Sequence, residues 1–187
     1  MGSQRGKSGA YFARSIDQLL IVKELKTDEF DYFSTTLGAK YFEYFNSNKK
    51  TLLAKIFGIY QVTTRNGPMF VMVMENLNFN LKLVAQYDLK GSTKGRLAPS
   101  TAEVLLDEDF SNIMKFWPYE ISPNSKTSFE VALRNDTEFL SSVRVMDYSL
   151  FIGVDQFSHE LICVIDPESY KRRFMEFMQK EFQLDGK

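Results

Sequence analysis

The chain has 187 residues, of which 44% are hydrophobic and 25% are charged, and its formal net charge is −1. This near-zero charge excludes bulk electrostatic binding to nucleic acid and predicts weak or absent contact with an anionic bilayer. The single cysteine, Cys163, excludes a disulfide framework and is typical of a reducing compartment. No apolar run approaches the ~20 residues of a membrane span. We therefore expect a cytoplasmic protein, and a monomer.

The predicted elements form one α+β domain with two lobes, residues 1–76 and 77–187. The first lobe combines an antiparallel sheet with a long helix, because its apolar residues indicate two strand pairs. These strands are expected at 10–13, 19–25, 53–62 and 69–74. The second lobe is smaller and mixed, and its strand signals are weaker.

The long helix of the first lobe is predicted between the two strand pairs. Thr27 is the expected N-cap, followed by acidic residues in the first turn. Apolar residues recur at helical spacing from Phe30 to Tyr44, so this face of the helix should pack in the core. Gly38 is expected to break the helix in two.

The second lobe is predicted to contain three helices and one strand hairpin. The helices are expected at 109–116, 136–143 and 167–182, and the strands at 145–153 and 163–166. Trp117 and most of the Phe and Tyr residues are expected in the core. Asp166 and Pro167 form a good start for the last helix.

The hairpin brings two carboxylates toward one end of its strands. Asp147 stands at the start of the first strand and Asp166 at the end of the second, so an antiparallel pair sets them nearly opposite each other. Two carboxylates placed in this way can bind a divalent metal and orient a hydroxyl, as phosphoryl transfer from ATP requires. The alternative is that Asp147 simply begins a strand and Asp166 caps the helix after it.

A glycine-rich segment near the start of the chain is a second candidate for phosphate binding. The segment consists of Arg5, Gly6, Lys7, Ser8 and Gly9. It offers two cations and backbone N–H groups that can wrap a polyphosphate. The P-loop motif does not fit, because three residues instead of four separate Gly2 from Gly6. The alternative is a flexible, glycine-rich terminus.

Lys23 lies within the apolar strand expected at 19–25. An isolated lysine in such a strand is either an outward-facing residue or the cation that reaches the α- and β-phosphates of a nucleotide. The order of the elements favours the nucleotide, because the glycine-rich segment precedes Lys23 and a helix follows it. Glu29, near the start of that helix, is expected to pair with Lys23 and hold its ammonium.

The segment 87–96 holds three cations, two glycines and two hydroxyls in ten residues. Its cations are Lys90, Lys94 and Arg96. Such a cluster is either a solvated loop or an anion-binding loop for the transferred phosphate or for phosphates on the acceptor.

Seven short motifs follow one another along the chain. They lie at 6–9, 21–23, 73–77, 88–92, 139–142, 146–150 and 165–166. The most specific are Asp-Leu-Lys-Gly-Ser at 88–92 and Met-Asp-Tyr-Ser-Leu at 146–150. With these motifs the sequence resembles the phosphatidylinositol phosphate kinase family, and most closely its PIKfyve-type branch. The His-Arg-Asp and Asp-Phe-Gly motifs of ordinary protein kinases are not present.

The resemblance implies a two-lobed kinase fold and a phosphotransferase that depends on ATP and Mg²⁺. The nucleotide would be bound by Arg5, Gly6, Lys7, Ser8, Gly9, Lys23, Glu75, Asn76 and Leu77, the last three against the adenine. The catalytic residues would be Asp147, Lys23 and Lys90, and the Mg²⁺ ligands Asp166 and Asp147. In this set Lys90 lies beside the transferred phosphate.

The sequence also departs from the family pattern. A long activation segment that meets the membrane follows the metal-binding aspartate in the family, whereas here Asp166 runs directly into the last helix. The first strand, before the glycine-rich segment, is expected to be absent or very short. Without the activation segment, we expect a soluble inositol phosphate as the acceptor, through a hydroxyl; a phosphate acceptor and a pyrophosphate product stay open. Its phosphates would meet Lys90, Lys94, Arg96, Lys171, Arg172 and Arg173.

Two other functions remain as alternatives. One is a PIKfyve-type lipid kinase, such as a 5-kinase, that acts on a phosphatidylinositol phosphate. The other is an inactive module that binds a nucleotide or a phosphoinositide, against which the complete set of Lys23, Asp147 and Asp166 argues. The cations at 171–173 also fit a solvated helix start.

Overall fold

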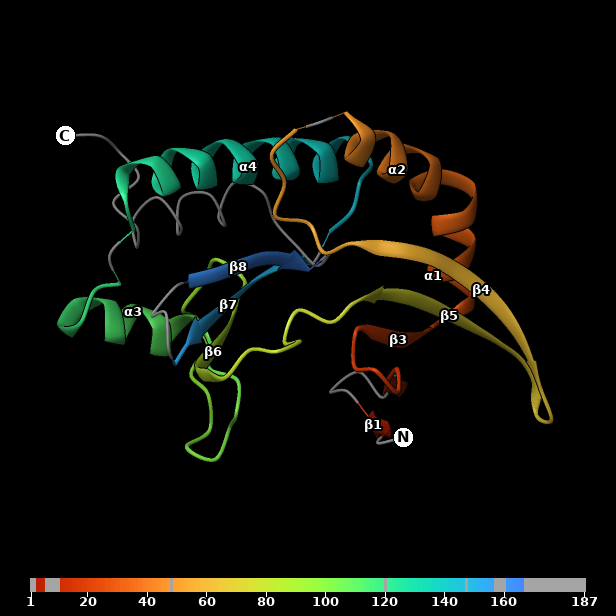
Figure 1. Ribbon diagram of the computed structural model, residues 1–187, viewed down its shortest axis with the longest axis horizontal. Coiled ribbons are helices and arrows are strands. Elements are labelled where there is room, and N and C mark those ends of the chain that lie inside the picture. The colour runs from red at the N-terminus through yellow and green to blue at the C-terminus, as the bar shows by residue number, and fades with distance from the viewer. Residues whose placement is uncertain are drawn as a thin grey trace. The chain divides into compact units, whose positions relative to one another are not determined.

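The computed structural model describes residues 3–5, 11–47, 49–119, 121–146, 148–156 and 161–166, with 3–5 and 161–166 described by their backbone. The chain divides into two compact units (Figure 1). Unit 1 comprises Met1–Ser47 and Ala54–Asn80, and unit 2 comprises Asn48–Leu53 and Leu81–Lys187. This division differs from a single boundary at 76–77, because the chain contributes Asn48–Leu53 to unit 2 before it returns to unit 1.

Unit 1 contains a five-stranded antiparallel sheet in the order β1-β2-β3-β5-β4. Its strands are β1 (Ser3–Arg5), β2 (Tyr11–Arg14), β3 (Leu20–Leu25), β4 (Ile56–Thr64) and β5 (Gly67–Glu75). The two predicted strand pairs are confirmed, and a strand of three residues, β1, leads into the glycine-rich segment. The β4–β5 turn ends at Gly67, whose φ of 113° favours a residue without a Cβ.

One helical segment supplies much of the core of unit 1. It runs as α1 (Thr27–Tyr32), a π-helical turn η1 (Phe33–Leu37) and α2 (Gly38–Asn46). Phe33, Tyr41 and Tyr44 are buried, and the ring of Phe30 stacks on Phe70 of β5 with 4.3 Å between the centroids. The helix face predicted to pack in the core is therefore confirmed.

Gly38 does not break this helix, contrary to the prediction. Its φ of −57° and ψ of −52° are helical, and the irregularity is the π-helical turn that ends just before it. A Cβ at Gly38 would lie 2.9 Å from the Phe33 carbonyl oxygen, so this close approach requires a glycine. The predicted cap is also displaced by one residue, because Lys26 is the N-cap and not Thr27.

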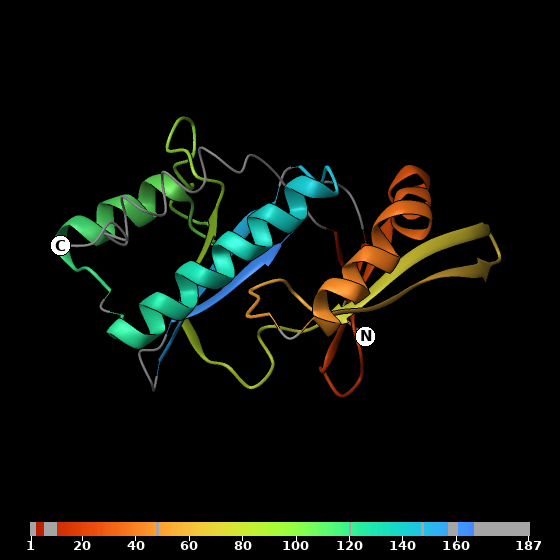
Figure 2. The same cartoon turned by 90° about the horizontal axis from the view of Figure 1, so that it is seen from above.

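Unit 2 contains a three-stranded antiparallel sheet and two long helices. The strands β6 (Leu83–Leu89), β7 (Ser149–Asp155) and β8 (Leu161–Asp166) stand in the order β6-β7-β8, and the helices are α3 (Asp107–Phe116) and α4 (Pro123–Ser142). Helix α4 runs along one face of the sheet (Figures 1 and 2). Leu133 of α4 and Leu150 and Ile152 of β7 are fully buried, so part of the core lies between helix and sheet. The α+β class is confirmed.

Strand β6 is a strand that the sequence signals only weakly. Gln86 and Asp88 interrupt its apolar residues, so its alternation is less clear than that of the first lobe. The strand is paired on both edges, because β7 lies on one side and the backbone of Leu105 bonds to it on the other. Leu105 donates to the Gln86 oxygen at 2.8 Å, and its own oxygen accepts the Asp88 N–H at 2.9 Å.

Helix α4 and the end of α3 also differ from the prediction. Helix α4 spans 20 residues and begins well before 136, because Ser122 caps it and Pro123 opens its first turn. Trp117, expected in the core, is 72% exposed, and so is Phe116. Both stand at the C-terminal end of α3, beyond the part of the helix that is buried through Phe110.

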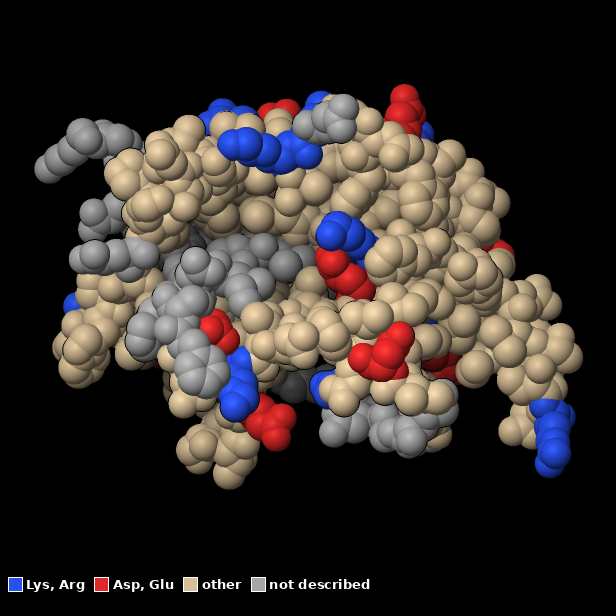
Figure 3. Space-filling model, viewed as in Figure 1, with Lys and Arg blue, Asp and Glu red and all other residues tan. Residues whose placement is uncertain are grey.

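One face of the molecule shows its charged side chains dispersed (Figure 3). On the face drawn in Figure 3, Lys and Arg side chains stand singly or beside acidic ones among uncharged residues. None of the helices in the described ranges combines the length and the apolar character needed to cross a bilayer. The helix predicted at 167–182 lies outside the described residues.

Candidate active site

Two of the predicted site residues meet at one end of the unit 2 sheet. The register pairs Leu89, the last residue of β6, with Leu150 of β7. One residue further along, Lys90 follows β6, and Ser149 at the start of β7 pairs with Asp166 at the end of β8. Because neighbouring strands lie ~4.8 Å apart, the backbones of Lys90 and Asp166 flank Ser149 at about 10 Å from each other.

The predicted hairpin is confirmed as the antiparallel pair of β7 and β8, with Asp166 at its end. Asp147 precedes β7 by two residues in the chain and lies outside the described residues. The same holds for Gly6, Lys7, Ser8, Gly9, Lys171, Arg172 and Arg173, and Arg5 and Asp166 are described by their backbone alone. The register nevertheless brings Lys90, the start of β7 and Asp166 to one sheet end.

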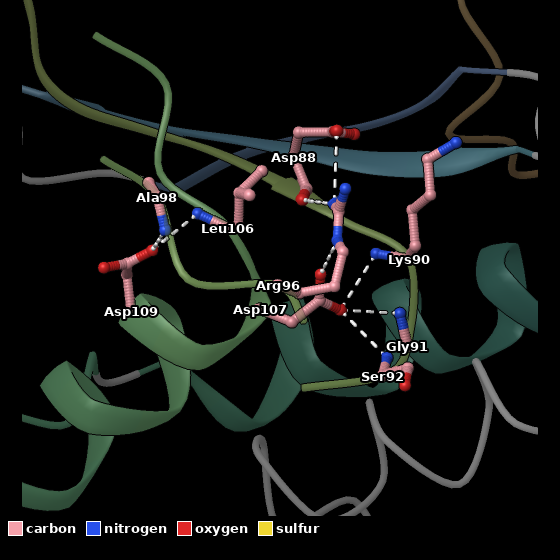
Figure 4. A network of polar contacts seen from close by, with 9 residues as sticks. All are labelled: Asp88, Lys90, Gly91, Ser92, Arg96, Ala98, Leu106, Asp107 and Asp109. Carbon is pink, nitrogen blue, oxygen red and sulfur yellow. Dashed lines mark hydrogen bonds and ion pairs between the residues drawn. The ribbon is translucent and has the colours of Figure 1, made fainter. Parts of the chain in front are cut away.

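A fully buried carboxylate holds the loop that follows β6. It belongs to Asp107, the first residue of α3 (Figure 4). Its Oδ1 accepts three consecutive backbone N–H groups, from Lys90 at 2.9 Å, Gly91 at 2.7 Å and Ser92 at 3.1 Å. Its Oδ2 accepts the Arg96 Nε–H at 2.8 Å. The sequence did not single out Asp107, because an acid in the first turn of a helix is also what the helix dipole favours.

Arg96 is engaged within the same network. Its Nη2 donates to the backbone oxygen and the carboxylate of Asp88, and its side chain is 21% exposed. Burial by itself lowers the pKa of Arg96, but the hydrogen bond and the charge of Asp107, with the charge of Asp88, outweigh burial and raise this pKa. The guanidinium that the sequence assigns to a substrate phosphate thus has two carboxylate partners inside the protein.

The remaining cations of this loop point elsewhere. Lys94 is exposed, and the side chain of Lys90 extends away from Asp107 (Figure 4). Gly91 and Gly95, with φ of 75° and 68°, turn the backbone through the left-handed region. Since Asp107 already occupies the N–H groups of residues 90–92, a phosphate at this loop would be bound by side chains.

Lys23 occupies the middle of the unit 1 sheet, where β3 pairs with β2 on one side and β5 on the other. By the two-residue alternation of a strand, Lys23 shares a face with Leu25. Leu25 pairs with Phe70, on which Phe30 of α1 stacks. Lys23 therefore lies on the face of the sheet that α1 covers, and it is half-buried.

Glu29 has a different partner from the one expected. Its Oε2 accepts the Lys26 N–H at 2.8 Å, which closes the first turn of α1. Among the ion pairs of the described residues, none joins Glu29 to Lys23. The expected pairing is not formed, because the N–H groups at a helix start lack intrahelical partners and the carboxylate meets this need.

The residues predicted to contact adenine follow the end of β5. The Glu75 carboxylate accepts the Lys55 N–H at 2.8 Å and lies 3.5 Å from the Lys55 ammonium. The buried Asn76 donates its side-chain N–H to the Gln18 oxygen at 2.7 Å. These contacts fix the connection, and the backbone N–H of Leu77 has no hydrogen-bond partner within the described ranges.

The elements of the two units are those of a kinase-like α+β fold. A family model described as phosphatidylinositol-4-phosphate 5-kinase matches residues 2–161. The chain therefore belongs to the phosphatidylinositol-4-phosphate 5-kinase family, and the resemblance seen in its motifs is confirmed.

Several curated proteins are similar to the chain over most of its length. A putative 1-phosphatidylinositol-3-phosphate 5-kinase of Arabidopsis thaliana is 38% identical, covering 95% of the chain and 15% of its own length. The corresponding kinase of Saccharomyces cerevisiae is 36% identical, with 88% and 8% covered. The human one is 30% identical, with 96% and 11% covered. The chain thus spans a small part of each relative.

The alignments also show that the chain is shortened. Those with the Arabidopsis and human proteins run over 224 and 228 positions, more than the 187 residues of the chain. The relatives therefore hold residues that this chain lacks within the aligned range. The alignment lengths do not give the position of these residues, so the absence of an activation segment after Asp166 stays a prediction.

The expected acceptor is contradicted by the same relatives. Each is named for a phosphatidylinositol phosphate, which is a lipid, so a soluble inositol phosphate as substrate and partner is wrong. A pyrophosphate product has no support either. Weak or absent membrane contact had been predicted from the near-zero net charge. The argument failed because a net charge sums over the whole chain and does not report the local field at a site.

Proposed function

We propose that the chain is an ATP-dependent lipid kinase that phosphorylates phosphatidylinositol 3-phosphate on its 5-hydroxyl, the substrate for which its relatives are named. One observation supports this proposal most strongly. At the end of the unit 2 sheet, Lys90, just after β6, and Asp166, in β8, lie on either side of Ser149 in β7. A cation and a carboxylate on one rim are what phosphoryl transfer needs, because its catalysis consists of positioning and of charge stabilisation.

The nucleotide is bound by groups of unit 1. Lys23, with Arg5 and the segment 6–9, neutralises the phosphates of ATP. The Leu77 N–H donates to the adenine ring. Glu75 and Asn76 contribute by holding this connection in place, because their side chains are already bonded within the protein.

The transferring groups belong to unit 2. Asp147 and Asp166 supply carboxylate oxygens, which Mg²⁺ prefers as ligands, so this donor set fits the ion. Bound Mg²⁺ would neutralise charge on the ATP phosphates. Asp147 also accepts the proton of the attacking hydroxyl, while the ammonium of Lys90 stabilises the charge on the transferred group.

The lipid headgroup is bound by cations at the surface. Lys94 is exposed in the same loop as Lys90 and contacts a headgroup phosphate. Lys171, Arg172 and Arg173 follow Asp166 in the chain and contact phosphates of the headgroup or of the bilayer. A charge-assisted contact of this kind is worth ~1.5–3 kcal/mol, so a few suffice for recognition. Arg96, tied to Asp88 and Asp107, shapes the loop instead.

The test is a labelling assay with the full chain, radiolabelled ATP and Mg²⁺. One arm offers vesicles that contain phosphatidylinositol 3-phosphate, and the other offers the matching soluble headgroup. We expect labelled lipid, with the new phosphate at the 5-position, and at least ~100-fold less label with Asp147→Asn. Label in the soluble arm alone would contradict the proposal. Vesicle binding without any label would indicate a binding module.

A further inference from the structure

The loop that carries Lys90 is fastened by one buried acid. We infer that Asp107, together with Arg96, is a positioning residue that sets the Lys90 ammonium against the transferred phosphate. This inference rests on the proposed function for its catalytic consequence, while the fastening itself is visible in the structure (Figure 4). It concerns two side chains that are bonded to each other and to the loop.

Hydrogen-bond donors surround the buried carboxylate of Asp107. A carboxylate that is 0% exposed is costly to bury unless donors surround it, and Asp107 has four within 3.1 Å. Three of them are the consecutive N–H groups of Lys90, Gly91 and Ser92. Because one oxygen binds all three, the backbone of Lys90 cannot shift without breaking charge-assisted hydrogen bonds.

Arg96 connects the loop to the elements on both sides of it. Its guanidinium bridges Asp107 in α3 and Asp88 in β6, so the loop is bound to both elements between which it runs. The far end of the loop is held as well, because the Glu108 N–H donates to the Arg96 oxygen at 3.0 Å and Asp109 accepts the Ala98 N–H at 2.9 Å. The loop is thus fastened at both ends to the first turn of α3.

Most of the groups of this loop that could bind a phosphate already have partners within the protein. Two carboxylates surround the Arg96 guanidinium, and Asp107 fills the concavity formed by the N–H groups of residues 90–92, where an anion could otherwise bind. The loop therefore offers a phosphate its lysine side chains. The backbone of Lys90, in line with Ser149 and Asp166, is the base from which its ammonium extends, and the position of this backbone depends on Asp107.

The experiment compares Asp107→Asn with Asp109→Asn. The control acid lies two residues further on, in the same first turn of α3, and accepts the N–H groups of Ala98 and Leu106. Backbone hydrogen exchange is measured for the segment 90–92 in the full chain. We expect roughly tenfold faster exchange with Asp107→Asn, because a neutral amide is a weaker acceptor and meets Arg96 with an N–H. Asp109→Asn should leave this segment unchanged.

Kinetics then test the consequence for Lys90. We expect Asp107→Asn to lower kcat about 10- to 100-fold while the KM for ATP stays within about twofold, since the nucleotide is bound elsewhere. In a Lys90→Ala background the same substitution should cost less than about threefold, because its effect runs through Lys90. Asp109→Asn should give the same loss in both backgrounds.

Arg96→Gln is a second variant, which removes the bridge to Asp88 and keeps the Asp107 carboxylate. We expect faster exchange at 90–92 and a lower kcat here too. This variant tests the inference if Asp107→Asn does not fold. Unchanged exchange in the folded variants would overturn the fastening. Faster exchange with a full additional loss in the Lys90→Ala background would overturn the positioning role. A wild-type chain that labels no lipid would refute the proposed function. The exchange data would still test whether Asp107 holds the backbone of residues 90–92.

Discussion

The three cations of the loop after β6 carry the same charge but have different surroundings. Arg96 is bound by two carboxylates, Lys90 is half-buried and held by its backbone N–H, and Lys94 is exposed. The partners of Arg96 lie 8 and 11 residues away along the chain, in β6 and in α3. A cluster of cations in a sequence therefore indicates an anion site without showing which cation serves it.

Tyr148 gives a prediction for pH dependence. It is 1% exposed, and burial raises its pKa from 10.0 to about 12. Between these values the unfolded chain has lost the phenol proton that the folded chain still holds, so stability falls as pH rises through this window, by on the order of 2 kcal/mol. We expect Tyr148→Phe to lose less stability than the wild type between about pH 10 and 12.

Urea unfolding of the full chain at several pH values measures this difference. Burial raises the pKa of Tyr87 as well, so the variant should remove only part of the alkaline loss. Tyr60→Phe, at a position that is 52% exposed, is the matched control and should follow the wild type. Parallel curves for the wild type and Tyr148→Phe would show that Tyr148 does not contribute.

At the scale of elements, the segment Asn48–Leu53 is attached to α4 by another buried acid. Asp136 is 0% exposed, and its two oxygens accept the Thr51 hydroxyl at 2.7 Å and the Leu52 N–H at 2.6 Å. These bonds explain why a short stretch between α2 and β4 belongs to unit 2. They also explain why a boundary drawn along the sequence misses it, since Asp136 lies more than 80 residues further on.

Thr51→Val should therefore destabilise unit 2. The substitution keeps the shape of the side chain but removes a donor from a buried carboxylate, which costs ~1–3 kcal/mol in the free energy of unfolding. Lys50→Ala is the control, because Lys50 donates to the Ser128 hydroxyl at 2.7 Å on the exposed side of the same segment. That variant should lie within ~0.5 kcal/mol of the wild type. Equal losses in urea unfolding would refute the importance of the buried contact.

At the scale of the whole molecule, the proposed work is divided between the units. Unit 1 holds Lys23 and the connection at Leu77, which we assign to the nucleotide. Unit 2 holds Lys90 and Asp166, which we assign to phosphoryl transfer. The division follows the chain, since the family motifs for the nucleotide precede residue 81 and the others follow it.

A nucleotide should therefore stabilise the chain through Lys23. With a non-hydrolysable ATP analogue and Mg²⁺ at 100 times the Kd, binding adds about 2.7 kcal/mol and should raise the Tm by roughly 5–10 °C. We expect Lys23→Ala to lose most of this rise. Lys26→Ala, at an exposed position just beyond the same strand, should keep it. A wild-type Tm that does not respond to the analogue would contradict the assignment.

Local patterns predicted those features that depend on neighbours in the chain. The hairpins, the buried face of the first helix and the end of β8 at Asp166 follow from alternation, helical spacing and turn residues. The errors have the opposite character. Gly38 continues a helix because of a π-helical turn, Trp117 is exposed because α3 ends there, and Glu29 serves its own helix start. Each depends on where an element begins or ends, which propensity determines poorly.

The amino-acid sequence alone determined the family of this protein and the order of its motifs, because each motif is a contiguous stretch that can be recognised without a structure. The tertiary structure decided which of these residues share a rim and which charges are already paired. Register placed Lys90 and Asp166 on either side of Ser149, and folding brought Asp107 to the loop and paired Arg96 with two carboxylates. Hydrogen bonds between segments far apart in the chain fix these positions, and a local sequence pattern does not predict which distant residues will pair.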